Sequence, residues 1–149
     1  MASQRALVFL DASVLVAASR SPSGGSAVAM EACQGRRFRA AMTNQVLIEA
    51  RINIAEKFGE RELVRFYQQL AGLDPEMVPP SSADHIAECV PLTTEKDAHV
   101  LAAALECKAA YLLTLDRRHL LSPEVLAAGL SVRVMTPGAI FSIGWNVVA

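Results

Sequence analysis

The sequence predicts an α/β fold in which about five parallel strands carry helices on both faces. Short apolar runs alternate along the chain with longer segments of helical periodicity. Parallel strands need such a segment to cross from one to the next, so the alternation favours parallel pairing over hairpins. The chain has 149 residues, a length typical of one compact domain. We therefore expect residues 1–149 to form a single domain.

The first half of the chain predicts two strands and three helices. Buried strands are expected at Ala6–Leu10 and Phe38–Met42, because both are short and largely apolar. A loop rich in serine and glycine at residues 21–26 precedes a helix over residues 26–33. Thr43 or Asn44 is placed to cap a helix over residues 45–58, which Gly59 ends. A further helix is expected over residues 60–71.

The second half predicts three more strands and further helices. The strands are expected at residues 77–78, 111–115 and 132–135. Ser81 or Ser82 caps a helix that ends near residue 89, and Thr94 caps a very apolar helix over residues 95–107. Short helices are expected over residues 117–121 and 123–128. Pro137-Gly138 then breaks the chain after the last strand.

Four acidic residues occupy positions where this fold would gather them. Asp11 follows the first strand, and Asp116 follows the apolar run at residues 111–115. Asp97 lies at the start of the apolar helix, and Glu49 lies on the helix over residues 45–58. In a parallel sheet the binding crevice lies beyond the carboxyl ends of the strands, where the strand order reverses. Carboxylate oxygens suit Mg²⁺ or Mn²⁺, so the pattern predicts metal-dependent hydrolysis of a phosphodiester.

Each acid also has an ordinary structural explanation. Asp11 and Asp116 are placed to cap helices, and Asp97 stands three residues after Thr94, as in a capping box. Glu49 belongs to a polar strip that solvent alone would explain. Two hydroxyl groups support the metal-site interpretation, because Ser13 and Thr114 each lie two residues from an acid and can orient a carboxylate.

The helix over residues 45–58 carries two apolar stripes. The first includes Val46 and Ile54, and the second includes Ile48 and Ile52, with Glu49 on the polar strip between them. Two stripes predict packing on two sides of the helix. We interpret the second side as a contact with another subunit.

Composition excludes several classes of protein. The net charge is −1 and the pI is about 6.3, which does not suit binding of nucleic acid through bulk positive charge. The chain is 52% hydrophobic with a mean hydropathy of +0.30, yet no apolar stretch reaches the ~20 residues of a membrane helix. The first residues lack the apolar segment of a signal peptide, so we expect a cytoplasmic protein.

Cysteine and histidine positions do not predict a zinc site. The three cysteines are widely spaced in apolar helical contexts and are interpreted as buried free thiols. The three histidines lack a shared ligand spacing, and His119 is interpreted as a surface residue near Asp116. Arg117, Arg118 and His119 follow the last acid and are assigned a weak role in binding RNA phosphates. A second arginine cluster spans residues 36–39.

Four segments together resemble the PIN-domain nucleases, in particular the small VapC-type toxins of bacterial toxin–antitoxin pairs. The matching segments are residues 10–15, 44–49, 96–105 and 111–120, in the family's order over nearly the whole chain. By this resemblance, Asp11, Glu49, Asp97 and Asp116 form the catalytic metal site, and Thr114 matches a small hydroxyl position. Two residues depart from the pattern without removing a ligand: Leu115 stands where glycine is frequent, and Asn44 replaces a frequent serine.

The resemblance implies a three-layer fold with a five-stranded parallel sheet and a homodimer. It also implies cleavage of single-stranded or structured RNA with Mg²⁺ or Mn²⁺, leaving 5′-phosphate and 3′-hydroxyl ends, and a cognate antitoxin as partner. The alternative is a non-catalytic PIN-like module for binding or assembly. A haloacid dehalogenase type of phosphatase is a poor match, because it needs a second acid where this chain has Ser13. A receiver domain is equally poor, since its clustered acids and later lysine are missing.

Overall fold

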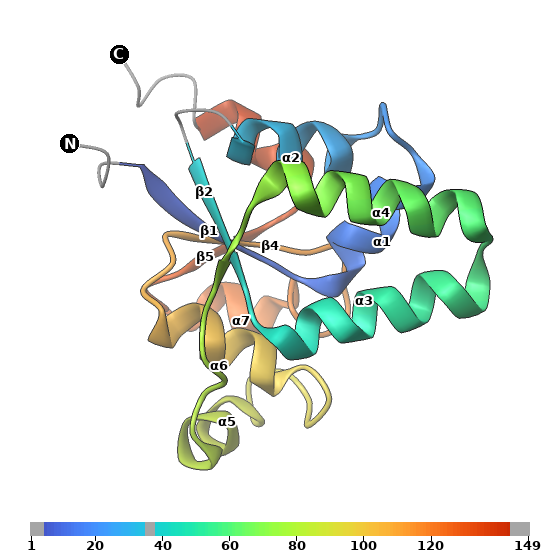
Figure 1. The fold of residues 1–149 in the computed structure, drawn as a ribbon. Coiled ribbons are helices and arrows are strands. Elements are labelled where there is room, and N and C mark those ends of the chain that lie inside the picture. The colour runs from blue at the N-terminus through green and yellow to red at the C-terminus, as the bar shows by residue number, and fades with distance from the viewer. Residues whose placement is uncertain (1–4, 35–37, 144–149) are drawn as a thin grey trace.

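The chain forms a five-stranded, all-parallel sheet. The computed structural model describes residues 5–34 and 38–143, which leaves part of the arginine cluster at residues 36–39 outside the described residues. The strands are β1 (Ala6–Leu10), β2 (Phe38–Met42), β3 (Glu76–Met77), β4 (Tyr111–Leu113) and β5 (Arg133–Met135), in the order β3-β2-β1-β4-β5 (Figure 1). The predicted parallel sheet is confirmed, and its first two strands have the expected bounds.

Helices cover both faces of the sheet. The helices α1 (Ala12–Arg20), α2 (Gly25–Gln34), α3 (Asn44–Lys57) and α4 (Glu60–Leu73) pack against one another on one side of the strands. On the other side lie α5 (Ala83–Cys89), α6 (Ala98–Glu106) and α7 (Pro123–Ala127) (Figure 1). This division is what right-handed crossovers produce when the strand order runs outward in both directions from the centre. The result is a three-layer α/β fold.

The core is built from the central strands and the helix α6. Phe9, Leu10, Leu112 and Leu113 are fully buried where β1 and β4 pair. The helix α6 is buried on most of its surface, as its apolar sequence predicts. Its start is therefore held firmly, which fixes the position of the residue that precedes it, Asp97.

Three local predictions at the site are wrong. The helix expected from residue 95 begins at Ala98, because Thr94 Oγ1 accepts the Asp97 amide N–H and residues 95–97 form a turn. The strand β4 ends at Leu113, two residues early. Residues 117–120 form a turn and not a helix, since Asp116 Oδ1 accepts two consecutive backbone N–H groups.

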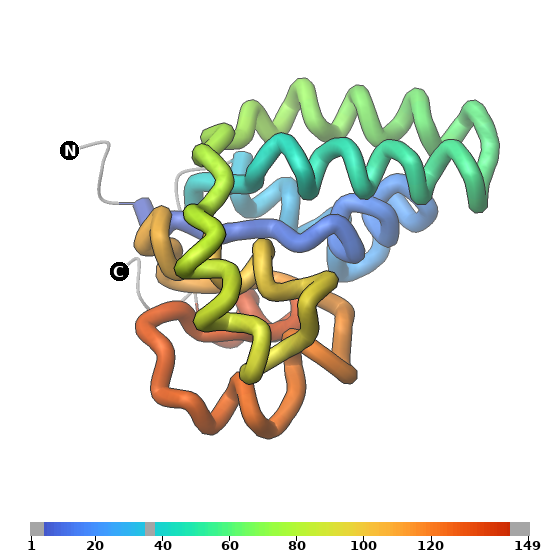
Figure 2. The backbone as a smooth tube through the Cα atoms, turned by 90° about the horizontal axis from the view of Figure 1, so that it is seen from below, coloured from blue at the N-terminus to red at the C-terminus, as the bar shows by residue number. Residues whose placement is uncertain are grey.

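Other element boundaries shift by small amounts. The segment after Pro137, expected as a break, is a 3₁₀ helix at Pro137–Ile140. Gly59 separates α3 from α4 as expected, and its N–H donates to Glu62 Oε1 at 3.0 Å, so it also begins α4. Viewed from below, α3 and α4 lie side by side and extend well beyond the sheet (Figure 2). No helix within residues 5–34 and 38–143 is long and apolar enough to cross a membrane.

The reversal of strand order lies between β1 and β4. From β1 the chain moves to β2 and then β3 on one side, and β4 and β5 follow on the other. The carboxyl ends of β1 and β4 therefore mark the place where an open α/β sheet binds its ligands. Asp11 follows β1 directly, and residues 114–116 follow β4.

Candidate metal centre

Asp11 is fixed at the junction of the two central strands. Its backbone N–H donates to Leu113 O at 3.1 Å, which extends the pairing of β1 with β4 by one residue. The residue is 6% exposed. Its Oδ2 accepts hydrogen bonds from Ser13 Oγ at 2.7 Å and Thr114 Oγ1 at 2.8 Å. Both hydroxyl groups predicted to support an acid therefore orient this carboxylate.

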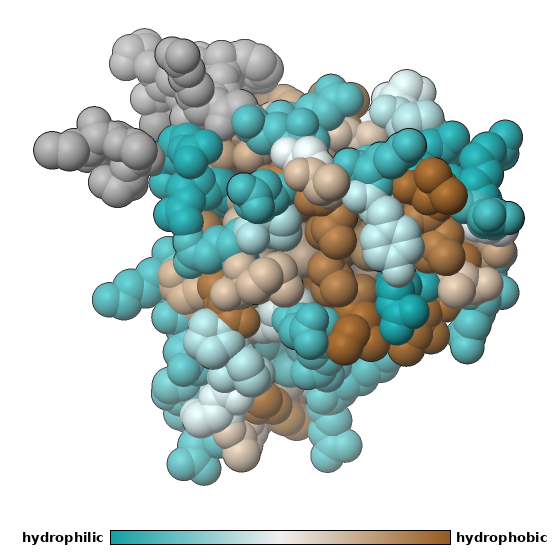
Figure 3. Space-filling model, viewed as in Figure 1, coloured by the Kyte–Doolittle hydropathy of each residue, from teal (hydrophilic) through white to brown (hydrophobic). Residues whose placement is uncertain are grey.

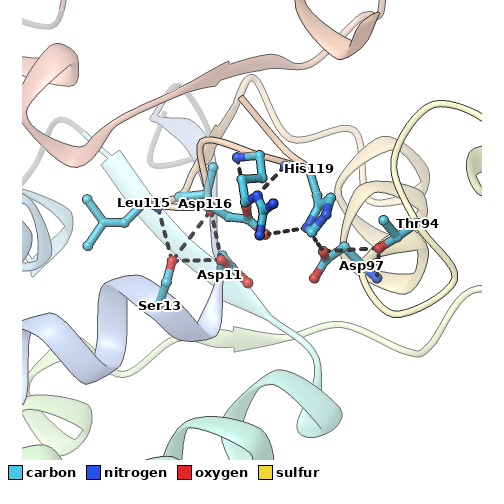
Figure 4. A network of polar contacts seen from close by, with 9 residues as sticks. Asp11, Ser13, Thr94, Asp97, Leu115, Asp116 and His119 are labelled. Carbon is cyan, nitrogen blue, oxygen red and sulfur yellow. Dashed lines mark hydrogen bonds and ion pairs between the residues drawn. The ribbon is translucent and has the colours of Figure 1, made fainter. Parts of the chain in front are cut away.

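The same hydroxyls hold the loop that carries Asp116. Ser13 Oγ accepts the Leu115 N–H, and Thr114 Oγ1 accepts the Asp116 N–H, each at 3.0 Å (Figure 4). Each hydroxyl thus gives its single proton to Asp11 and receives a proton from the backbone after β4. This network links Asp11 to Asp116, as Figure 4 shows.

Asp116 has one oxygen committed to the backbone and one facing the site. Its Oδ1 accepts the N–H groups of Arg118 at 3.1 Å and His119 at 3.0 Å. Its Oδ2 lies 3.5 Å from His119 Nδ1. The turn after β4 therefore orients both the carboxylate of Asp116 and the imidazole that contacts it.

Asp97 reaches the same imidazole from the opposite direction. Thr94 Oγ1 donates a hydrogen bond to Asp97 Oδ2 at 3.2 Å. The same Asp97 Oδ2 lies 3.3 Å from His119 Nδ1. One ligand atom from each of Asp97, Asp116 and His119 lies within 4.8 Å of the other two. Residues from the start of α6 and the loop after β4 thereby form one cluster (Figure 4).

The carboxylates are close enough to disturb one another's ionisation. Partial burial raises the pKa of Asp97, and the charges of Asp116 and Asp11 raise it further. Burial also raises the pKa of Glu49 on α3, as do the neighbouring charges of Asp11 and Asp97. Negative charge is therefore unfavourable at both groups, and a cation between them would relieve it.

Three of the four predicted acids, Asp11, Asp97 and Asp116, are linked at one edge of the sheet, and Glu49 on α3 is related to them through charge alone. Asp11 and Asp116 are joined by the hydroxyl network, Asp116 and Asp97 by His119, and Glu49 lies within electrostatic range of Asp11 and Asp97. Arg117 and Arg118 are exposed directly beside Asp116. The donor set, carboxylate oxygens with one imidazole, fits a divalent cation.

Sequence interpretation missed one member of this cluster. His119 is not a detached surface residue: its side chain is 41% exposed, but its ring contacts two acids. Its spacing of three residues from Asp116 is the signal that could have found it, because a turn or helix brings such residues together.

Comparison with known proteins identifies the family. A family model described as a PIN domain matches residues 7–118, which is most of the chain and contains all four acids. The chain belongs to the PIN domain family. A comparison with curated proteins finds no match.

Solved structures resemble this PIN domain in fold. A chain of the VapBC2 complex from Rickettsia felis, crystallised with a DNA fragment from its promoter, has a TM-score of 0.65 at 14% identity and covers 87% of this chain and 98% of its own. PAE2754 from Pyrobaculum aerophilum has a TM-score of 0.60 at 15% identity, covering 99% and 97%. VapC20 from Mycobacterium tuberculosis, a toxin that cleaves the sarcin-ricin loop, has a TM-score of 0.53 at 17% identity, covering 85% and 98%. At these identities the likeness shows the fold.

Proposed function

We propose that this PIN domain is a metal-dependent endoribonuclease and the toxin of a toxin–antitoxin pair. The observation that carries the proposal is the convergence of acids from β1, α6 and the loop after β4 at the reversal of strand order. The substrate is single-stranded or structured RNA, cut at a phosphodiester to leave 5′-phosphate and 3′-hydroxyl ends. The family match and the fold shared with VapC20, itself an RNA-cleaving toxin, support this choice.

The acids are the proposed ligands of Mg²⁺ or Mn²⁺. Asp11, Asp97, Asp116 and Glu49 would hold one or two ions. Burial and the neighbouring acids raise the pKa of Asp97 and of Glu49, although His99 and Lys96 partly offset this at Glu49, and this net direction supports a cation site. A bound ion of this kind lowers the pKa of water and neutralises charge that develops on phosphoryl oxygens.

The remaining residues position these groups. Ser13 and Thr114 hold the Asp11 carboxylate in one orientation, so it need not reorganise when the substrate binds. The exposed side chains of Arg117 and Arg118 lie beside Asp116, where they would contact the RNA backbone. Phosphate contacts of this kind place the scissile bond without selecting a base sequence.

Protein partners complete the proposal. The fold shared with a chain of the VapBC2 complex supports a cognate antitoxin. A homodimer and a cytoplasmic location, both expected from the sequence, belong to the same proposal. An adjacent reading frame that encodes a small DNA-binding protein would support the toxin role.

Substitution of one acid tests the nuclease. Asp116→Asn keeps an oxygen for the Arg118 and His119 N–H groups but removes the charge. Loss of a ligand should cost at least the roughly 10–100-fold typical of changes around a metal. Cleavage of a labelled RNA in Mn²⁺ should fall by that factor or more, and EDTA should abolish it. Asp74→Asn, at an exposed left-handed position after α4, is the matched control. Equal cleavage by Asp116→Asn and wild type would refute the assignment.

The non-catalytic alternative predicts a different response to metal. A true site gains stability from its ligand, by about 2.7 kcal/mol at a hundred times the Kd. We expect Mn²⁺ to raise the Tm of the wild type and to leave that of Asp116→Asn unchanged. An RNA-binding module without a metal site would show neither the Mn²⁺ effect nor cleavage.

A further inference from the structure

We propose that His119 is a nitrogen ligand of the metal centre and that it shifts the preference of the site from Mg²⁺ towards Mn²⁺. This inference rests on the proposed function, because it assigns a further ligand to the same ion. It goes beyond the four acids that the sequence pattern predicts. The argument depends on where the His119 ring lies, what holds it there, and which ions accept nitrogen.

The position of Nδ1 suits a shared ligand better than a simple ion pair. His119 Nδ1 lies 3.3 Å from Asp97 Oδ2 and 3.5 Å from Asp116 Oδ2. Neighbouring ligands about 2.1 Å from an octahedral ion lie about 3 Å apart. The two distances from His119 Nδ1 are therefore close to those that one ion would impose, and the carboxylate ligand atoms of Asp97 and Asp116 lie within 4.8 Å of each other.

The backbone fixes the ring in this position. Asp116 Oδ1 accepts the N–H of His119, and the resulting turn brings the imidazole back over the acid that begins it (Figure 4). The same turn orients Asp116 Oδ2 towards the ring. The side chain is also 41% exposed, so an ion from solvent can reach it.

A second histidine shows what an ordinary pair looks like in this protein. His85 Nδ1 contacts one carboxylate oxygen, Glu106 Oε2, at 2.7 Å on the surface. His119 instead faces two carboxylates, Asp116 of its own turn and Asp97 at the start of α6, at longer and nearly equal distances. This arrangement leaves room for an ion between the His119 ring and the two carboxylates, whereas His85 and Glu106 form a direct hydrogen bond with each other.

The chemistry of imidazole determines the metal preference. Mg²⁺ is a hard ion that takes oxygen ligands and keeps several waters, while transition ions accept imidazole nitrogen readily. A centre of carboxylates alone would discriminate weakly between Mg²⁺ and Mn²⁺. Adding one nitrogen favours Mn²⁺.

Binding and spectroscopy test this inference on the purified protein. Calorimetric titration should give a Kd for Mn²⁺ that rises about tenfold in His119→Gln, while the Kd for Mg²⁺ changes by less than about threefold. Pulsed electron paramagnetic resonance of bound Mn²⁺ should show ¹⁴N coupling from imidazole in the wild type, and this coupling should be lost in His119→Gln. His85→Gln is the matched control and should behave as the wild type. Thermal unfolding in EDTA checks that each variant folds, with His119→Asn as the second variant.

The outcomes separate this inference from the nuclease proposal. Tight Mn²⁺ binding without ¹⁴N coupling in the wild type, or an unchanged ratio of Mn²⁺ to Mg²⁺ affinity in His119→Gln, would overturn the role of His119 alone. Failure of the wild type to bind either ion would overturn the metal centre itself. Loss of the coupling together with a selective loss of Mn²⁺ affinity would support the assignment.

Discussion

Thr114 joins two acids through a single hydroxyl group. It is fully buried, donates to Asp11 Oδ2 and accepts the N–H of Asp116. Valine has nearly the same shape but can do neither. The buried hydroxyl is therefore both a structural element and the support of the site.

Thr114→Val should destabilise the protein and weaken cleavage. The substitution leaves the Asp116 N–H without its partner, and a lost buried hydrogen bond costs about 1–3 kcal/mol. Urea unfolding in EDTA measures the stability, and a labelled RNA measures cleavage. Thr114→Ser, which retains the hydroxyl, should keep most of both. Equal stability of the valine variant and wild type would show that the hydroxyl network contributes little to the free energy of unfolding.

Asp97→Asn should have the opposite effect on stability when metal is removed. Burial and the neighbouring acids raise the pKa of Asp97, so its ionised form at neutral pH opposes folding. Asparagine removes the charge and keeps an oxygen for the Thr94 hydroxyl. In EDTA we expect a Tm higher by about 2–4 °C, the shift that corresponds to roughly 1 kcal/mol in a protein of this size. A lower Tm than that of wild type would mean that contacts with His119 outweigh the repulsion.

Some residues of the candidate site could be predicted from the sequence and others could not. The proximity of Asp11, Asp97 and Asp116 was predictable because each stands at the end of an apolar run or at the start of a helix, and the topology brings such positions together, whereas Glu49 lies within α3. The spacing of His119 from Asp116 was a signal for their contact, but the contact of its ring with Asp97 could not be predicted, because it depends on a turn formed by the Asp116 side chain. Such side-chain-to-backbone bonds leave no periodic signal.

Among the elements, those with a strong local pattern were predicted best. The strand β1 and the buried helix α6 follow from continuous apolar sequence, and the stripe of Val46, Ala50 and Ile54 is the buried side of α3 as expected. The strand β4 is shorter than predicted, and β3 is displaced by one residue from its predicted position. The ends of both strands depend on their pairing with neighbouring strands. The start of α6 was misplaced because Thr94 caps a turn before the helix.

The pairing of α5 with α6 should depend on pH. Glu106 raises the pKa of His85, and the hydrogen bond from His85 lowers the pKa of Glu106. The contribution of His85 is lost as pH rises through its raised pKa, and that of Glu106 is lost as pH falls through its lowered pKa. The pair therefore stabilises the fold most between the ordinary values of 4.5 and 6.5.

Urea unfolding of His85→Gln against wild type measures this contribution. The difference between the two proteins should be small, because the pair is exposed, and largest near about pH 5.5. The difference should disappear once the pH exceeds the raised pKa of His85. A difference independent of pH would assign the effect of the substitution to packing and not to charge.

At the scale of the whole molecule, apolar side chains remain on the outer surface of α3 and α4. Ile48 and Ile52 on α3 are 39% and 44% exposed, and Val64 and Tyr67 are exposed on α4. Figure 3 shows apolar surface over these two helices. The second stripe predicted on α3 is thus left without a partner within the described part of the chain, which supports the subunit contact proposed from the sequence.

Replacement of both isoleucines by lysine should separate a homodimer. Because Ile48 and Ile52 are exposed, the double variant should fold with a stability within about 0.5 kcal/mol of wild type. Sedimentation velocity should show a dimer for wild type and a monomer for the variant. Leu126→Lys on α7, where the leucine is 57% exposed, is the control and should remain dimeric. A wild type that sediments as a monomer would contradict the dimer proposal.

The bond from Thr114 to Asp11 also determines when the proposed metal site can form during synthesis of the chain. Its two residues are 103 positions apart, and β1 pairs with β4 only after the intervening chain has emerged. Long-range closure of this kind is slow and comes late in folding. The site that we propose for metal binding therefore forms only after the residues of β4 have been synthesised and have paired with β1.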